Sequence, residues 1–301
     1  MSGPWGYRSY RQHLAARFPG LHVRKLCLQA GFTCPNLDGT VAKGGCAWCD
    51  NAGFSPGLNV PSLEQQWERG RLWLRRRHRQ VDGFIAYLQS FSNTHAPLPR
   101  LRALYNRFPN DFPECVGVAI GTRPDCLSND IIAYLDEIGR RTFLTIELGL
   151  QSDRDAVLRQ MNRGHTVAQF RDAIARAADH AFELCVHVIL GLPGEGDDAP
   201  ERLGTLLSSL PIQSVKIHNL HVMRGTALAR MQAAGVVQPL TRADYIASAT
   251  RLITHLRPDQ AVQRTVADAP DALLCSEPWC HDKQGVLQEM KAALTGLTVN
   301  A

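Results

Sequence analysis

The chain has 301 residues, of which 45% are hydrophobic and 20% are charged, a composition typical of globular proteins. No apolar run approaches the ~18 residues that a membrane-spanning helix needs, and the N-terminus lacks the basic and then apolar order of a signal peptide. We therefore expect a cytoplasmic protein without membrane association. The formal net charge of +5 permits a polyanionic partner without requiring one.

The first third of the chain predicts two helices and two strands. Residues 5–20 are amphipathic and end at a Pro-Gly pair, which predicts a helix. Residues 22–29 predict a strand that leads into a cysteine-containing loop. Residues 62–79 predict the second helix and residues 83–91 the second strand.

The same alternation of strand and helix continues toward residue 220. Further strands are predicted at 115–121, 143–149, 183–190 and 214–220, and helices at 98–108, 128–139, 154–161, 167–180 and 199–209. Such alternation is typical of parallel βαβ units, and six of them close only part of a ring. We therefore predict an α/β fold, an open, partial (β/α)6 barrel of the TIM type. It forms one domain over residues 1–301, with a core at about 20–238 and a C-terminal extension, 239–301, that contains a helix at 242–256.

Three cysteines, Cys34, Cys46 and Cys49, lie on the glycine-rich loop after the first predicted strand, and no nearby residue is an obvious fourth ligand. Three thiolates suit an iron–sulfur cluster that leaves one iron open. A structural zinc site normally has a fourth protein ligand, and Cys27 on the preceding strand is the candidate for that alternative. The chain has nine cysteines, and an odd number argues against a disulfide framework.

Further motifs accompany the cysteines. They are Gly31-Phe32-Thr33-Cys34-Pro35-Asn36, Ile120-Gly121-Thr122-Arg123-Pro124-Asp125-Cys126, Glu147-Leu148-Gly149-Leu150-Gln151-Ser152, Asn162-Arg163-Gly164-His165, Gly191-Leu192-Pro193-Gly194-Glu195 and Pro278-Trp279-Cys280. In this order they resemble the radical SAM superfamily, and the eleven residues between the first two cysteines resemble its YhcC/YtqA-like branch. The broader group includes the Elongator catalytic subunit and the oxygen-independent coproporphyrinogen oxidase.

The resemblance implies two cofactors. The three cysteines would hold a [4Fe–4S] cluster, and its fourth iron would bind S-adenosylmethionine (SAM). An electron from a donor of the flavodoxin or ferredoxin type would cleave SAM to a 5′-deoxyadenosyl radical, which abstracts hydrogen from the substrate. A tRNA wobble-uridine side chain is the first candidate substrate, because relatives in the broader group act there, and a small metabolite is the alternative.

The resemblance also implies roles for residues near the cofactor. Trp48 would pack near the adenine, and Asn93 would bind the methionine part. Gln151 and Arg163 match a pair that contacts the ribose and the carboxylate, and a guanidinium suits a carboxylate. His187 occupies the position of an acidic ribose ligand.

One departure from the family pattern concerns the third predicted strand. Gly121 stands where the broader group often has a glutamate, so Thr122 or Glu147 is expected to replace that contact. Glu147 is equally a candidate for a buried structural carboxylate.

An arginine-rich run bears on the choice of substrate. Six arginines and no acid lie between residues 69 and 79, and Arg71, Arg75 and Arg79 recur one helical turn apart. Such a row predicts either a solvated face or a contact with RNA phosphates near the barrel mouth. The roles of four other residues stay open between structural burial and substrate contact or redox chemistry: His218, His221, Cys275 and Cys280.

Overall fold

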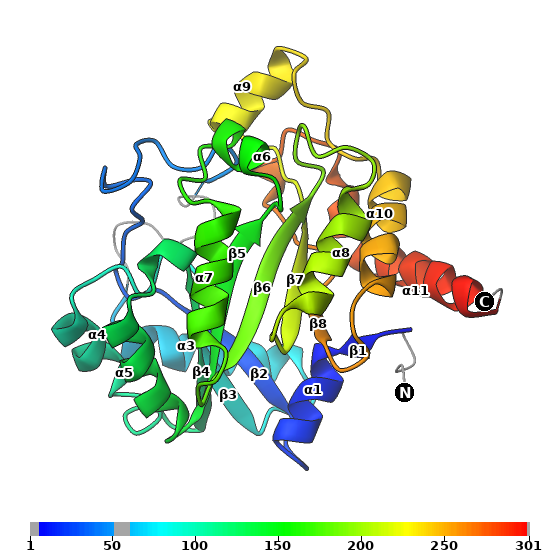
Figure 1. Cartoon of the computed structure of the whole chain (residues 1–301). Coiled ribbons are helices and arrows are strands. Elements are labelled where there is room, and N and C mark those ends of the chain that lie inside the picture. The colour runs from blue at the N-terminus through cyan, green and yellow to red at the C-terminus, as the bar shows by residue number, and fades with distance from the viewer. Residues whose placement is uncertain (1–5, 51–60, 300–301) are drawn as a thin grey trace.

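The computed structural model describes residues 6–50 and 61–299 and contains one sheet of eight parallel strands (Figure 1). The strands follow the order β1-β8-β7-β6-β5-β4-β3-β2, so β1 and β2 form the two edges. They are β1 (Arg8–Ser9), β2 (Val23–Leu28), β3 (Gly83–Leu88), β4 (Cys115–Thr122), β5 (Phe143–Gln151), β6 (Glu183–Leu190), β7 (Ser214–Asn219) and β8 (Ala261–Arg264).

Helices follow most strands and cover the outer face of the sheet (Figure 1). They are α1 (Tyr10–Arg17), α3 (Leu63–Arg77), α4 (Leu98–Tyr105), α5 (Asn129–Gly139), α6 (Asp155–Gln160), α7 (Val167–Ala177), α8 (Ala199–Ser209), α9 (Ala227–Ala233), α10 (Arg242–Thr254) and α11 (Lys283–Val299), with 3-10 turns at Pro124–Cys126, Asp271–Leu273 and Pro278–His281. None of the helices in the described ranges is both long and apolar enough to cross a membrane.

The central strands are buried on both faces, as parallel strands in α/β folds are. Every residue of β3 is buried, and in β6 only His187 is partly exposed. The main core is therefore a continuous apolar layer between the sheet and the helices.

The sheet curls into a partial barrel without closing. Lys25 on β2 donates a hydrogen bond from Nζ to Gln263 Oε1 on β8 at 2.6 Å, across the interior between two distant strands of the sheet. The strands β1 and β2 are not paired with each other, so the ring stays open. This confirms the open partial barrel and all six predicted strands.

Two strands were not predicted. β1 has two residues and lies where a longer N-terminal helix was expected, and β8 has four residues inside the expected C-terminal extension. Both pair in parallel, β1 with β8 and β8 with β7. The region after residue 239 therefore contributes a strand to the sheet, next to the barrel interior.

Candidate functional site

The cysteine loop leaves β2 at the carboxyl edge of the sheet, where barrel enzymes place their sites. Two backbone turns shape it: Leu37 N–H donates to the Cys34 carbonyl at 2.7 Å, and Cys49 N–H to the Cys46 carbonyl at 2.9 Å. All three cysteines line a cavity of about 230 Å³ together with the ends of β4 and β5.

Two asparagines join this loop to the segment after α6. The Asn36 side chain donates to the carbonyls of Asn162 at 2.5 Å and Arg163 at 2.9 Å. In return, the Asn162 side chain donates to the Gly45 carbonyl at 2.7 Å. Gly164 has φ +78°, and a Cβ there would lie 2.3 Å from Asn36 Oδ1, so this contact needs glycine. The reciprocal amide contacts fix the cysteine loop against the barrel.

The donor set around the cavity fits an iron–sulfur cluster better than zinc. In a tetrahedral zinc site with Zn–S bonds of about 2.3 Å, the sulfurs lie only ~3.8 Å apart. Among the described residues, the group of three ligand atoms within 4.8 Å of one another is Glu147, Cys185 and His187, and the loop cysteines do not form such a group. Cys27 does not line the cavity, so the structure gives no support to the zinc alternative.

Polar hydrogens also point toward one cysteine sulfur. Asn36 Nδ2 lies 3.5 Å and Arg163 Nη1 3.8 Å from Cys46 Sγ, and such N–H groups stabilise a thiolate. Ser92 Oγ and Arg163 Nε are buried at this cavity without a hydrogen-bond partner within the described part of the chain. Buried polar atoms of this kind are usually satisfied, so they suit a polar ligand.

The end of β5 is bent toward the same cavity. The register with β6 shifts between Gly149 and Gln151, and Gln151 has φ +75°, a strained value for a residue with a side chain. A Cβ on Gly149 would lie 2.4 Å from Gln151 Nε2 and 2.6 Å from Arg163 Nη2. Gly149 therefore lets both side chains pack over the strand end, and the structure brings this predicted pair together.

Arg163 is held from two sides. Its Nη2 donates to the Gly149 carbonyl at 2.7 Å, and its own carbonyl accepts from Arg123 Nη1 at 2.8 Å. The buried Arg123 also binds Asp125 through two hydrogen bonds of 2.9 and 2.8 Å. The Thr-Arg-Pro-Asp motif thus acts as a brace for Arg163.

Three other predicted residues differ in their access to the cavity. Trp48 lines it and packs against an apolar cluster around Met161. Thr122 also lines it, and its hydroxyl donates to Thr94 Oγ1 at 2.6 Å, because Thr94 itself donates to the Cys126 carbonyl. Asn93 is buried, and its amide donates to the carbonyls of Leu88, Ser90 and Gly121. Its neighbour Ser92 lines the cavity instead, so a cofactor contact by Asn93 stays a prediction.

Glu147 lies at the centre of a charged network inside the barrel. Its side chain is fully buried and binds Lys25, Lys216 at 2.5 Å and His187 at 2.8 Å. Burial raises the pKa of Glu147, but the two lysines and His187 outweigh it and hold the pKa well below its ordinary value. Burial lowers the pKa of His187 to about 4, so this ring is neutral at pH 7. The carboxylate oxygens have protein partners, which favours the structural role for Glu147 and gives it a second function in orienting His187.

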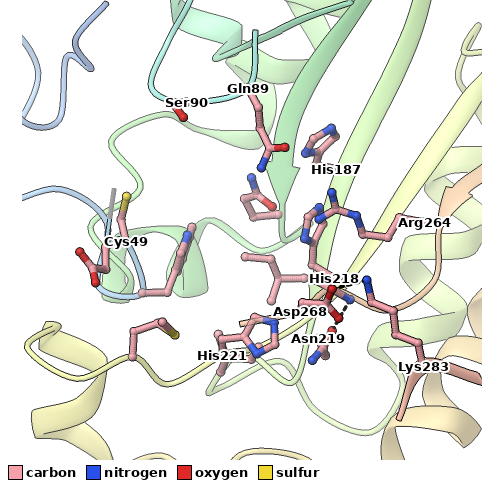
Figure 2. Close-up of a pocket in the computed structure, with 17 residues that line it drawn as sticks. Cys49, Gln89, Ser90, His187, His218, Asn219, His221, Arg264, Asp268 and Lys283 are labelled. Carbon is pink, nitrogen blue, oxygen red and sulfur yellow. Dashed lines mark hydrogen bonds and ion pairs between the residues drawn. The ribbon is translucent and has the colours of Figure 1, made fainter. Parts of the chain in front are cut away.

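A larger cavity of about 430 Å³ adjoins the cysteine cavity. Five residues line both: Trp48, Cys49, Gln89, Gln151 and His187. Figure 2 shows the larger cavity, with Cys49 on one side and His218, Arg264 and Lys283 on the other. The two cavities therefore lie side by side and share a wall, and together they extend from the cysteine loop to β8.

The arginine row on α3 does not lie at this site. Arg71 and Arg75 both form ion pairs with Glu114, which directly precedes β4. Glu114 therefore lies at the amino-terminal ends of the strands, whereas the cysteine loop lies at their carboxyl ends. The helix ends at Arg77, so Arg79 lies beyond it. The expected position of this row near the barrel mouth is therefore wrong, whereas RNA binding by these arginines stays a prediction.

Comparison with known proteins gives the family. The model of the radical SAM superfamily matches residues 40–207, and that of the Radical_SAM C-terminal domain matches residues 212–295. The first match begins after Cys34, so the role of this cysteine depends on the geometry of the loop.

Relatives match over most of the chain. YtqA of Bacillus subtilis is 34% identical over 93% of this chain and 87% of its own length, and YhcC of Escherichia coli K12 is 32% identical over 88% and 84%. Human Elongator complex protein 3 is 28% identical over 54% of this chain and 30% of its own length.

Solved structures agree on the fold. Archaeal Elp3 from Methanocaldococcus infernus superposes with a TM-score of 0.67 at 17% identity, over 90% of this chain and 63% of that one. Methylornithine synthase PylB superposes with a TM-score of 0.55 at 10% identity, over 94% and 85%. The chain thus belongs to the radical SAM superfamily and is an enzyme whose cofactors are a [4Fe–4S] cluster and SAM.

Proposed function

We propose that Cys34, Cys46 and Cys49 hold the cluster and that SAM extends from it over Gln151 and Arg163. The observation that carries the proposal is that the three-cysteine cavity adjoins a larger one and shares five wall residues with it. The larger cavity thus gives the substrate a place beside the cofactor. A reduced cluster held there would supply the electron that cleaves SAM, and SAM would supply the radical for hydrogen abstraction from the substrate.

The residues of this chain position the cofactor and exclude water. The Arg163 guanidinium is anchored by the Gly149 carbonyl and suits the carboxylate of SAM. Gln151 would contact the ribose and Trp48 the adenine, and Thr122 would replace the side-chain contact that Gly121 lacks. His187 forms the wall between the cofactor half and the substrate half and is oriented by Glu147.

Replacing Arg163 by alanine is expected to weaken SAM binding about ten- to a hundredfold. This is the effect of losing a charge-assisted hydrogen bond that contributes ~1.5–3 kcal/mol to the binding free energy. Gln151→Ala loses a neutral hydrogen bond and is expected to weaken binding roughly two- to tenfold. The measurement is the dissociation constant of SAM for the cluster-loaded protein.

Arg159→Ala is the matched control, since Arg159 is an exposed arginine on α6 four residues before Arg163. It should bind SAM as the wild type does. Wild-type affinity in both the Arg163 and the Gln151 variants would show that SAM lies elsewhere.

For the substrate, the tRNA wobble-uridine side chain remains our first hypothesis and a small metabolite the alternative. The larger cavity, at about 430 Å³, can admit a single base with its side chain or a compound of that size. The ion-paired arginines of α3 lend no support to RNA binding, so the tRNA hypothesis now depends on the resemblance alone.

Anaerobic incubation with unmodified and modified tRNA, SAM and reduced flavodoxin or ferredoxin separates the two hypotheses. A tRNA enzyme would change the mass of one nucleoside in wild-type reactions and leave it unchanged with Cys46→Ala. Formation of 5′-deoxyadenosine without any nucleoside change would favour the small-metabolite alternative.

A further inference from the structure

The larger cavity, which adjoins β6, β7 and β8, has its own set of polar residues. In the register of the sheet, His187 lies opposite Lys216 and Lys216 opposite Arg264, so these side chains share the interior face. His218 is two residues beyond Lys216 on β7 and shares that face nearer the mouth. Figure 2 shows the Arg264 guanidinium pointing toward His187 and His218, into the cavity.

Arg264 is partly buried, lines the larger cavity and has no partner there in the described chain. Within the ranges that the structure describes, its guanidinium has no hydrogen bond or ion pair, although most arginines of the chain are paired. The nearby Lys283 is different, because it forms an ion pair with Asp268 at the cavity wall. A partly buried guanidinium without an acid is an expected feature of an anion site.

Two histidines beside Arg264 also have unused nitrogens. Nε2 of His218 and Nε2 of His221 are buried and have no hydrogen-bond partner among the described residues. Burial, with smaller effects from Arg264 and other neighbours, lowers the pKa of both rings, that of His221 to about 4. Both rings are therefore neutral at pH 7.

This polar set is separate from the cofactor half. Arg264, His218 and His221 line the larger cavity and not the cysteine cavity, whereas Arg163 lines only the cysteine cavity. Arg123 and Arg163 line the cysteine cavity, Arg123 being paired with Asp125, and Arg264 is the arginine of the larger cavity. A single SAM carboxylate already has its partner in Arg163.

We propose that the substrate of this enzyme is an anion whose carboxylate or phosphate binds Arg264, with a hydrogen-bonding group of the same molecule on His221 Nε2. This inference rests on the proposed function, because it assigns the larger cavity to the substrate. It places the anionic end at β8 and the reacting carbon near Gln151 and His187, the wall shared with the cofactor half. Arg264 is then a specificity-determining residue.

The test titrates the cluster-loaded protein, labelled with ¹⁵N in its histidine rings, with inorganic phosphate in one arm and acetate in the other. Resonances of His218 and His221, assigned with the His218→Gln and His221→Gln variants, should shift in at least one arm. The arm that binds more tightly identifies the anion. Arg264→Gln should weaken that binding about ten- to a hundredfold. Arg264→Lys, which keeps the charge and loses the fork, should fall between Arg264→Gln and the wild type.

Arg171→Gln is the matched control, because Arg171 is exposed on α7 and likewise has no partner in the described chain. It should bind both anions as the wild type does. The Arg264→Gln variant should keep the visible spectrum of the loaded cluster and the urea-unfolding midpoint of the wild type, which shows that the variant is folded.

Three results would overturn the inference: no histidine shift with either anion, unchanged affinity in Arg264→Gln, or displacement of SAM by the anion. If the wild type forms no 5′-deoxyadenosine, the proposed function fails. If it forms 5′-deoxyadenosine normally but binds neither anion, only the present inference fails.

Discussion

Replacing Cys34, Cys46 or Cys49 by alanine is expected to abolish the brown colour of the anaerobically reconstituted protein and its cleavage of SAM. Each thiolate bonds one iron, and the structure offers no substitute among the residues that line the cavity. The wild type should contain about four irons and four sulfides per chain, as a [4Fe–4S] cluster does. Iron and sulfide analysis together with the visible spectrum measures this effect.

Cys27→Ala is the control for these variants. Cys27 lies on β2 opposite Tyr87 and does not line the cysteine cavity, so its removal should leave iron, sulfide and colour unchanged. A colourless protein with one zinc ion per chain, whose retention requires Cys27, would refute the cluster assignment.

Replacing Glu147 by glutamine is expected to destabilise the fold by about 3–5 kcal/mol, because it leaves Lys25 and Lys216 buried without their carboxylate. Burial alone lowers the pKa of both lysines. At Lys25 the ion pair with Glu147 outweighs this effect and the pKa is raised, whereas at Lys216 burial dominates and the pKa is about 7. In the Glu147→Gln variant, loss of a proton from Lys216 should therefore reduce the destabilisation of the fold. The midpoint of urea unfolding at pH 7 measures the loss.

Glu137→Gln is the matched control for Glu147→Gln. Glu137 pairs with Arg102 on the surface, where both side chains are half-exposed, so its removal should hardly change the midpoint. The pKa of Glu147 is lower in the folded than in the unfolded protein, where it is about 4.3. The contribution of its carboxylate to stability is therefore complete above pH ~4.3 and is lost as the pH falls from there through the folded pKa. An equal midpoint in the Glu147 variant and the wild type would show that the network contributes little.

The sequence was informative where the signal is local. The central strands are continuous apolar runs because both faces are buried, and the helices that separate them have regular apolar periods. The cysteines of the loop and the Gln151–Arg163 pair are likewise close in sequence, so their spacing could be recognised before the structure. Asn36 was quoted only as part of a motif, and its contact with Asn162 became visible in the fold.

Other features depend on contacts between distant segments. β1 and β8 are too short to show the alternation of apolar and polar residues that predicts a strand. They form because β8 pairs with β7 and β1 pairs with β8. Glu114 lies 39 residues from Arg75, so its ion pairs with Arg71 and Arg75 have no local signature in the sequence. Arg264 ends a short polar strand, and nothing in its neighbours indicated that it faces the same cavity as the cysteine loop.

The most direct test of the cluster site and its open iron is a hyperfine measurement. SAM carrying ¹⁵N in its amino group and ¹⁷O in its carboxylate is added to the reduced, cluster-loaded protein, and the electron spin of the cluster is examined for coupling to these nuclei. We predict coupling from both labels in the wild type and in the Cys27→Ala variant, because three cysteines leave one iron for SAM. A fully loaded cluster with no coupling to either label would contradict the account.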